Sequence, residues 1–112
     1  MNIEDLEKVV KLASLLKKAE VDEPANDDMW HVGRKYFIRT VTMYLVGKLT
    51  KVTDKEMLLE DASWVADTGR FHDALKTGDF SEIEPFINVV IVNRNSVIDA
   101  TEWRFDLPTE QK

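Results

Sequence analysis

The spacing of apolar residues separates a helical part of the chain from a strand-rich part. Apolar side chains recur every three or four positions at Ile3, Leu6 and Val10, which predicts an amphipathic helix over residues 1–20. Acidic residues and a proline follow in the stretch VDEPANDD. Residues 21–35 are therefore expected to form an acidic linker and a lead-in segment, because proline stops a helix and charged side chains favour solvent.

Strand patterns begin at Tyr36. β-Branched and aromatic residues dominate residues 36–51, with apolar side chains on alternate positions, as is typical of strands. Gly47 lies inside this run and predicts a bend or a bulge. A polar turn over residues 52–56 leads into a further strand.

The last strand patterns predict a hairpin. Residues 87–92 form its first strand, residues 93–96 its turn and residues 97–103 its second strand. Val97 and Ile98 make the second strand apolar enough to need a covering neighbour, which predicts a homo-oligomer. The tail that follows is expected to be frayed.

The central stretch ASWVADTGRFHDAL (62–75) combines aromatic, acidic and basic residues with a glycine. Trp64 is expected to end a strand in the core, and residues 67–69 form a turn that Asp67 can stabilise. Phe71 and Leu75 fit one face of a short helix that Gly78 would end. The stretch is interpreted first as a structured insert, second as a recognition loop, and only third as an active site.

These elements predict a mainly β fold with an N-terminal α-helix. A small, strongly bent, five-stranded antiparallel barrel over residues 36–108, with a short helical insert at 66–85, fits the order best. The 112 residues are expected to form a single domain.

Composition narrows the function. The net charge of −6 and the pI near 4.9 disfavour general nucleic-acid coating, which depends on lysine and arginine. Without cysteine there is no disulfide framework and no thiolate metal site. The acidic start MNIEDLEK is unlike a signal peptide, and no apolar run is long enough to span a membrane, so a cytoplasmic protein is expected.

Arginines and aromatic residues are the candidate binding groups. The segment MWHVGRKYFIR (29–39) interleaves the two types, a combination that suits stacking on bases and pairing with phosphates. The alternative is a strand whose aromatics cover one end of the barrel. The candidate ligand-binding residues are Trp30, Arg34, Tyr36, Arg39, Trp64, Arg70, His72 and Arg94.

Catalytic chemistry has little support in the sequence. Asp61, Asp67, His72 and Asp73 could hold a hard cation if they converged, which leaves a metal-dependent hydrolase as one alternative. Their spacing matches no metal-binding motif, and there is no nucleophile elbow or phosphate-binding glycine loop. No catalytic residue, metal or cofactor is therefore predicted.

Two resemblances add to this interpretation. The runs TMYLVGKLTKVTDKEMLLEDA and VVIVNRNSVIDATEW resemble Sm-like proteins, and equally SH3-like barrels, over residues 36–104. The Sm-like resemblance implies an RNA-binding ring. The words VTDKEMLLEDASWVADTGRFHDAL, EPF, VIVNR and IDATEWR resemble a family of small phage and prophage proteins over residues 40–108, which implies an origin in a mobile element.

The function expected from all of this is noncatalytic. A phage- or prophage-encoded protein of this kind would act in counter-defence (anti-CRISPR proteins are one such class) by sequestering or blocking a host immune component. That component could be a cyclic or other small nucleotide signal, bound by the arginines, or a nucleoprotein effector, blocked by the acidic surface. The alternative is an Sm-like RNA-binding protein.

Overall fold

A computed structural model describes residues 28–112 of the chain. The predicted N-terminal helix, and the linker up to residue 27, lie outside the described residues. The chain separates into two units, Met1–His31 and Val32–Lys112, and the second contains all the strands described below. Among the residues that the structure describes, no helix is long and apolar enough to cross a membrane.

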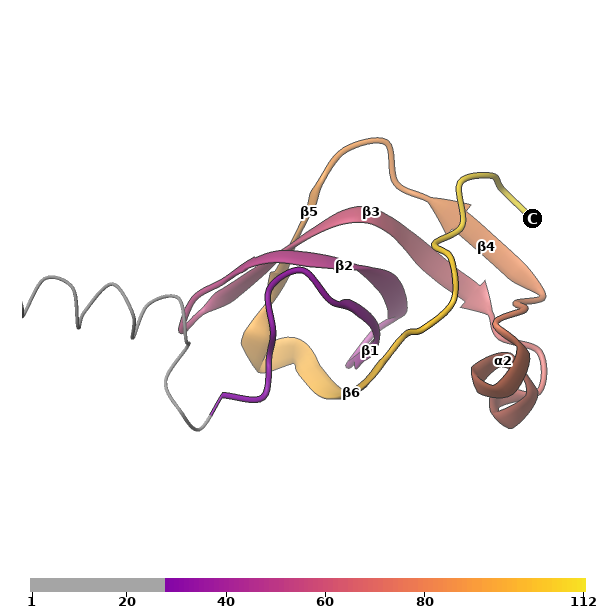
Figure 1. Cartoon of the computed structure of the whole chain (residues 1–112), viewed down its shortest axis with the longest axis horizontal. Coiled ribbons are helices and arrows are strands. Elements are labelled where there is room, and N and C mark those ends of the chain that lie inside the picture. The colour runs from indigo at the N-terminus through magenta and orange to yellow at the C-terminus, as the bar shows by residue number, and fades with distance from the viewer. Residues whose placement is uncertain (1–27) are drawn as a thin grey trace, which may run out of the picture. The chain divides into compact units, whose positions relative to one another are not determined.

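The second unit is mainly antiparallel β-sheet with one short α-helix, as Figure 1 shows. Five of the six strands follow the order β4-β3-β2-β1-β6, and the sixth, β5, pairs with the first half of β3. The elements are β1 (Lys35–Thr40), β2 (Tyr44–Val52), β3 (Glu56–Asp67), α2 (Phe71–Thr77), β4 (Glu82–Pro85), β5 (Val90–Asn93), the 3₁₀ helix η1 (Arg94–Ser96) and β6 (Val97–Glu102).

The predicted bend at Gly47 is confirmed. The register between β2 and β3 shifts between Val46 and Lys48, so the glycine lies in a bulge. A Cβ atom at Gly47 would lie 2.9 Å from the Cβ of Ala62, which shows how closely the two strands approach. The bulge bends β2 and lets the sheet curl.

The predicted hairpin over residues 87–103 is wrong, although both of its strands exist. β5 pairs with β3 and β6 pairs with β1, and the two do not pair with each other. The side chain of Asn93 accepts a hydrogen bond from the backbone N–H of Asn95 (2.9 Å), which turns the chain into η1 instead of reversing it.

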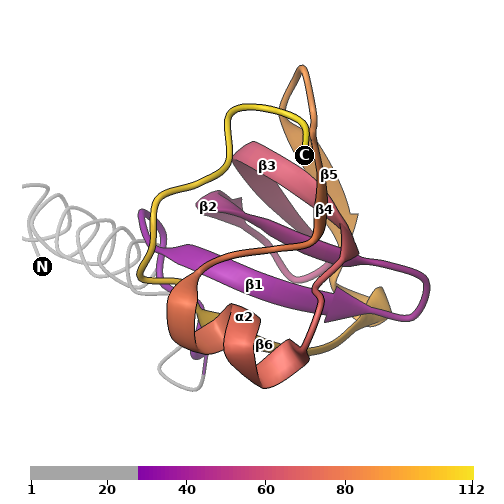
Figure 2. The same cartoon turned by 90° about the vertical axis from the view of Figure 1, so that its right-hand side faces the viewer.

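This short helix η1 joins two distant parts of the curled sheet. The N–H of Arg94 donates to the carbonyl of Lys55 just before β3, and the N–H of Val41 just after β1 donates to the carbonyl of Ser96 (both 2.9 Å). The start of β3 and the end of β1 are therefore brought close together, and Figure 2 shows the resulting curl. The hydrogen-bonded ladder itself does not close, because β5 and β6 are not paired.

Both faces of the sheet bury apolar side chains. On one face, Phe37 centres an aromatic cluster whose ring centroids lie 5.8–6.1 Å from its own. The members of that cluster are Tyr44, Phe71, Phe80 and Trp103. On the opposite face, Ile38 and Leu45 are buried, since neighbouring residues of a strand point to opposite sides.

The insert contains a helix, as predicted, and a strand that was not predicted. α2 spans Phe71–Thr77 and ends at Gly78, which has a left-handed φ of 79°. Arg70 is the N-cap of this helix and makes no side-chain capping bond. β4 follows within the range assigned to the insert.

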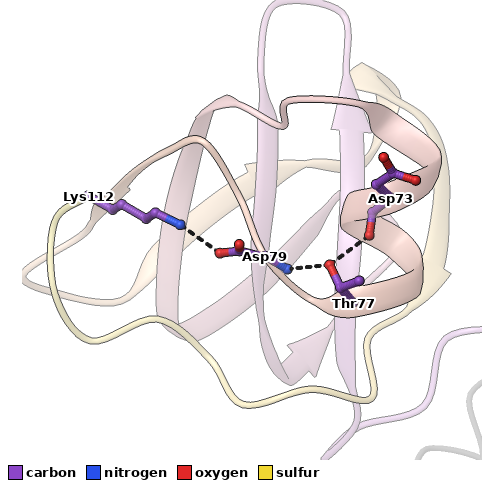
Figure 3. A network of polar contacts seen from close by, with 4 residues as sticks. All are labelled: Asp73, Thr77, Asp79 and Lys112. Carbon is purple, nitrogen blue, oxygen red and sulfur yellow. Dashed lines mark hydrogen bonds and ion pairs between the residues drawn. The ribbon is translucent and has the colours of Figure 1, made fainter.

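The tail was expected to fray but is held by specific contacts. Ile83 of β4 exchanges two backbone hydrogen bonds with Lys112, at 3.0 and 3.1 Å. The Nζ of Lys112 also pairs with Asp79 Oδ1 at 2.6 Å, and Asp79 follows the C-terminal end of α2. Figure 3 shows how this ion pair continues through Thr77 to the carbonyl of Asp73, so the tail is tied to both β4 and α2.

Candidate functional site

Three of the four arginines chosen as candidate ligand-binding groups have a partner within the protein. Arg34 lies 3.6 Å from Glu102, and Arg94 donates to the carbonyl oxygen of Thr53 at 2.6 Å. Arg39 forms a bidentate pair with Asp99. Arg34 precedes β1, Arg39 lies in β1 and Arg94 in η1, and each is engaged in a different contact, so they do not form one anion site.

The other candidates are also dispersed. Tyr36 is only 7% exposed, so its ring cannot stack on a base. Arg70 and His72 are exposed at the start of α2, and Trp30 is half-buried in the first unit, where its N–H donates to Asp28 Oδ1 at 3.0 Å. Of the predicted set, Trp64 lines an apolar pocket.

Arg39 in β1 contacts both Asp99 in the edge strand β6 and Phe71 in the helix α2. Nε of Arg39 donates to Asp99 Oδ1 at 2.7 Å across the β1–β6 pair, and the guanidinium lies 5.3 Å from the centroid of Phe71 in α2. These hydrogen bonds to Asp99 and to Tyr44 raise the pKa of Arg39, and the guanidinium lowers the pKa of Asp99 below its ordinary value of 3.8. The contacts of Arg39 therefore hold β1, β6 and α2 together, and this structural role explains its position.

The lowered pKa of Asp99 predicts how this pair responds to acid. Because the folded pKa lies below the unfolded one, the stabilisation is complete above pH 3.8 and disappears as the pH falls through the folded value. We expect the stability difference between wild type and Asp99→Asn to shrink from about pH 5 to pH 2. Urea unfolding of both proteins measures it.

Asp54→Asn is the matched control, because Asp54 is exposed in the β2–β3 turn and has no ion pair within residues 28–112. Its difference from wild type should change little over the same pH range. A difference for Asp99→Asn that stays constant down to pH 2 would contradict the role of the pair.

The metal-site alternative receives no support. No group of three or more histidine, aspartate or glutamate side chains that could hold a metal ion occurs in the part of the chain that the structure describes. Asp61, Asp67, His72 and Asp73 all lie within that part. Asp67 instead accepts a hydrogen bond from the N–H of Gly69 at 2.8 Å, as the predicted turn requires.

The strongest candidate site is an apolar pocket beside Trp64. Residues directly opposite each other in paired strands share a face, and one such row runs Ile38–Leu45–Trp64–Glu84 across β1, β2, β3 and β4. Its first two residues are buried, whereas Trp64 is 43% exposed. The expectation that Trp64 belongs to the core is therefore wrong: the row leaves the core at this residue.

The pocket, which we call the Trp64 pocket, has a volume of about 310 Å³. This lies at the lower end of the range for ligand sites. Apolar side chains and one acidic residue line it. They are Met43, Trp64, Glu84, Pro85 and Phe86.

Further apolar side chains are exposed along the chain after the pocket. Phe86 belongs to the pocket, and Ile87, Val89 and Ile91 follow it in the β4–β5 loop and in β5. Ile87 is 95% exposed. Single exposed apolar residues are ordinary, but a run of them that follows a pocket residue along the chain is typical of a segment that makes contacts.

One carboxylate belongs to this otherwise apolar site. Glu84 Oε1 accepts a hydrogen bond from Gln111 Nε2 at 3.0 Å, so the side chain is held by the ordered tail. Within residues 28–112, Glu84 has no cationic partner at ion-pair distance. The pocket surface is therefore almost wholly apolar, and Glu84 adds a carboxylate that is hydrogen-bonded to Gln111 and has no cationic partner among residues 28–112.

Trp64 is the one residue of the pocket that was predicted from the sequence as a binding residue. Glu84, Pro85 and Phe86 belong to a strand and a loop that were assigned to the insert or its border, and Met43 was counted among strand residues. The sequence EPF (84–86) could have indicated these residues, because an acidic residue, a proline and an aromatic residue in succession are typical of a loop that makes contacts.

No model of a known protein family matches the chain, and comparisons with curated proteins and with solved structures give no match either.

Proposed function

We propose that this protein is a noncatalytic binding protein of a phage or prophage. It acts in counter-defence by blocking a protein component of host immunity through the Trp64 pocket and the β4–β5 loop. The observation that carries the proposal is the partly exposed indole of Trp64 in an apolar pocket, followed by exposed apolar residues along the loop. Aromatic side chains that become buried when a complex forms contribute much of the binding energy of protein interfaces.

A protein partner suits this surface better than a nucleotide does. Nucleotides carry negative phosphates, whereas the pocket contains Glu84 and no arginine or lysine. Arg34, Arg39 and Arg94 already have partners in the fold, so using them on a phosphate would cost existing contacts. The apolar side chains of the loop also extend beyond what a small ligand would cover.

The scaffold we propose for this function is an SH3-like or Sm-like barrel. The strand order, the bend at Gly47 and the 3₁₀ connection η1 all support this proposal. The phage origin is supported by the resemblance of residues 40–108 to small phage proteins. Counter-defence follows as the role in which a small noncatalytic phage protein binds a host protein.

We also propose that the protein self-associates through β6. In the described part of the chain, β6 has only β1 as a strand neighbour, and five of its six residues are exposed. Ile98 is 64% exposed on this strand. An open edge with an apolar residue readily pairs with another strand, which supports a homo-oligomer.

Native mass spectrometry of protein purified from bacterial host cells tests the proposal. We expect the wild type to carry a host protein, and we expect Trp64→Ala and Phe86→Ala to lose at least about tenfold of it, as removing an interface anchor does. Ile98→Ser removes an exposed apolar group outside the pocket. It should keep the partner while weakening self-association.

Three results would contradict parts of the proposal. A partner retained in full by both pocket variants would rule out the Trp64 pocket. A stoichiometric nucleotide released by denaturation, in place of a protein, would rule out the protein partner. If the captured protein has no part in host defence, the binding function would stand but the counter-defence role would be contradicted.

A further inference from the structure

We propose that the Trp64 pocket binds a lysine or arginine side chain of its protein partner. The aliphatic stem would pack against Pro85 and Phe86, and the cationic head would lie over the indole of Trp64 within reach of Glu84. This inference rests on the proposed function, because it names the chemistry of the partner at the same site.

Aromatic rings and a carboxylate attract a cation by different forces. The face of an indole is the best aromatic partner for an ammonium or guanidinium group, through its quadrupole. A carboxylate adds a charge-assisted hydrogen bond. Trp64 and Glu84 are directly opposite each other in the β3–β4 register, so a single side chain can contact both.

The charges around the site favour the same choice. Glu84 has no cationic partner among the described residues, and its hydrogen bond from Gln111 uses only one acceptor site of the carboxylate. Glu82 on the same strand is also acidic and exposed. An acidic side chain entering the pocket would be repelled, and a purely apolar one would leave the charge of Glu84 uncompensated.

Long cationic side chains also match the apolar lining. Lysine and arginine bury their methylene stems on apolar surface while the charged head stays near water or a counter-ion. The pocket offers Met43, Pro85 and Phe86 for the stem, and Glu84 for the head. A small cation such as free ammonium would gain only the electrostatic contribution to the binding free energy, because it has no stem to pack on the apolar lining.

Short blocked peptides of one design test this inference with the full-length protein. The peptides are Ac-Gly-Leu-Xaa-Leu-Gly-NH₂ with lysine, arginine, norleucine or glutamate at Xaa. Binding is followed by the ¹H–¹⁵N resonance of the Trp64 indole, assigned with Trp64→Phe. We expect the lysine and arginine peptides to bind roughly five- to tenfold more tightly than the norleucine peptide, from a cation–π contact and an exposed ion pair together.

Glu84→Gln should reduce this preference for the cation about threefold and leave norleucine binding unchanged. Glu82→Gln is the matched control, because it removes the same charge from the same strand at a residue that does not line the pocket. It should leave the preference intact. Equal binding of the lysine and norleucine peptides, or a preference that Glu84→Gln does not reduce, would overturn the inference.

The two proposals fail in different ways. If the peptides bind without charge preference, or do not shift Trp64 at all, the inference fails while loss of the host protein in Trp64→Ala still supports the proposed function. If the host protein is retained by Trp64→Ala and Phe86→Ala, the proposed function fails whatever the peptides do.

Discussion

Replacing Phe37 by alanine is expected to lower the free energy of unfolding by about 3–5 kcal/mol, the usual cost of removing a buried phenylalanine. Phe37 is 2% exposed and contacts rings from four parts of the chain. A cavity there would separate the sheet from α2 and from the segment containing Trp103. Since small domains are stable by only about 5–15 kcal/mol, the variant should be close to unfolding. Urea denaturation followed by tryptophan fluorescence measures it.

Phe71→Ala provides the comparison for Phe37→Ala. Phe71 belongs to the same aromatic cluster but is 40% exposed, and it loses one edge-to-face contact and the contact with Arg39. We expect a loss of about 1 kcal/mol. Equal effects of the two substitutions would show that the cluster is not centred on Phe37.

Gly78→Ala is expected to cost about 2–5 kcal/mol for two separate reasons. The left-handed φ of 79° disfavours any residue with a Cβ by about 1–2 kcal/mol. A Cβ atom would also overlap the ring of Phe105, whose Cδ1 would be 2.8 Å away, and overpacking of this kind costs about 1–3 kcal/mol. Thermal and urea unfolding of the variant measure the sum.

Gly33→Ala separates these two reasons. Gly33 has a similar positive φ of 95°, but no atom lies within 4 Å of where its Cβ would be. For Gly33→Ala, only the destabilisation due to the positive φ should remain, at about 1–2 kcal/mol. If Gly33→Ala costs as much as Gly78→Ala, the ring of Phe105 moves aside freely and the overlap has no energetic weight.

Local features of the fold could be predicted from the sequence, and pairing between distant segments could not. The helix in the insert follows from the spacing of Phe71, Ala74 and Leu75 and from the glycine that ends it. β5 and β6 were found as strands, but their partners depend on the curl of the whole sheet, which no local pattern specifies. β4 is only four residues long and ends in Pro85, so its signal is weak.

The site was predicted in part, for a related reason. Trp64 follows the alternation of a strand, and alternation alone says that it shares a face with other apolar residues. Whether that face is covered at Trp64 depends on where β4 and the β4–β5 loop lie. The arginines were predicted to bind a ligand because of their charge. In the structure, Arg34, Arg39 and Arg94 instead contact other parts of the chain.

The pairing of β1 with β6 has a consequence for synthesis on the ribosome. Arg39 and Asp99, which face each other in this pair, are 60 residues apart in the chain. At a synthesis rate of about 5–20 residues per second, β1 waits roughly 3–12 s for its partner strand to be made. During that time one edge of β1 is open, so the unfinished chain is exposed to edge-to-edge aggregation until β6 is made.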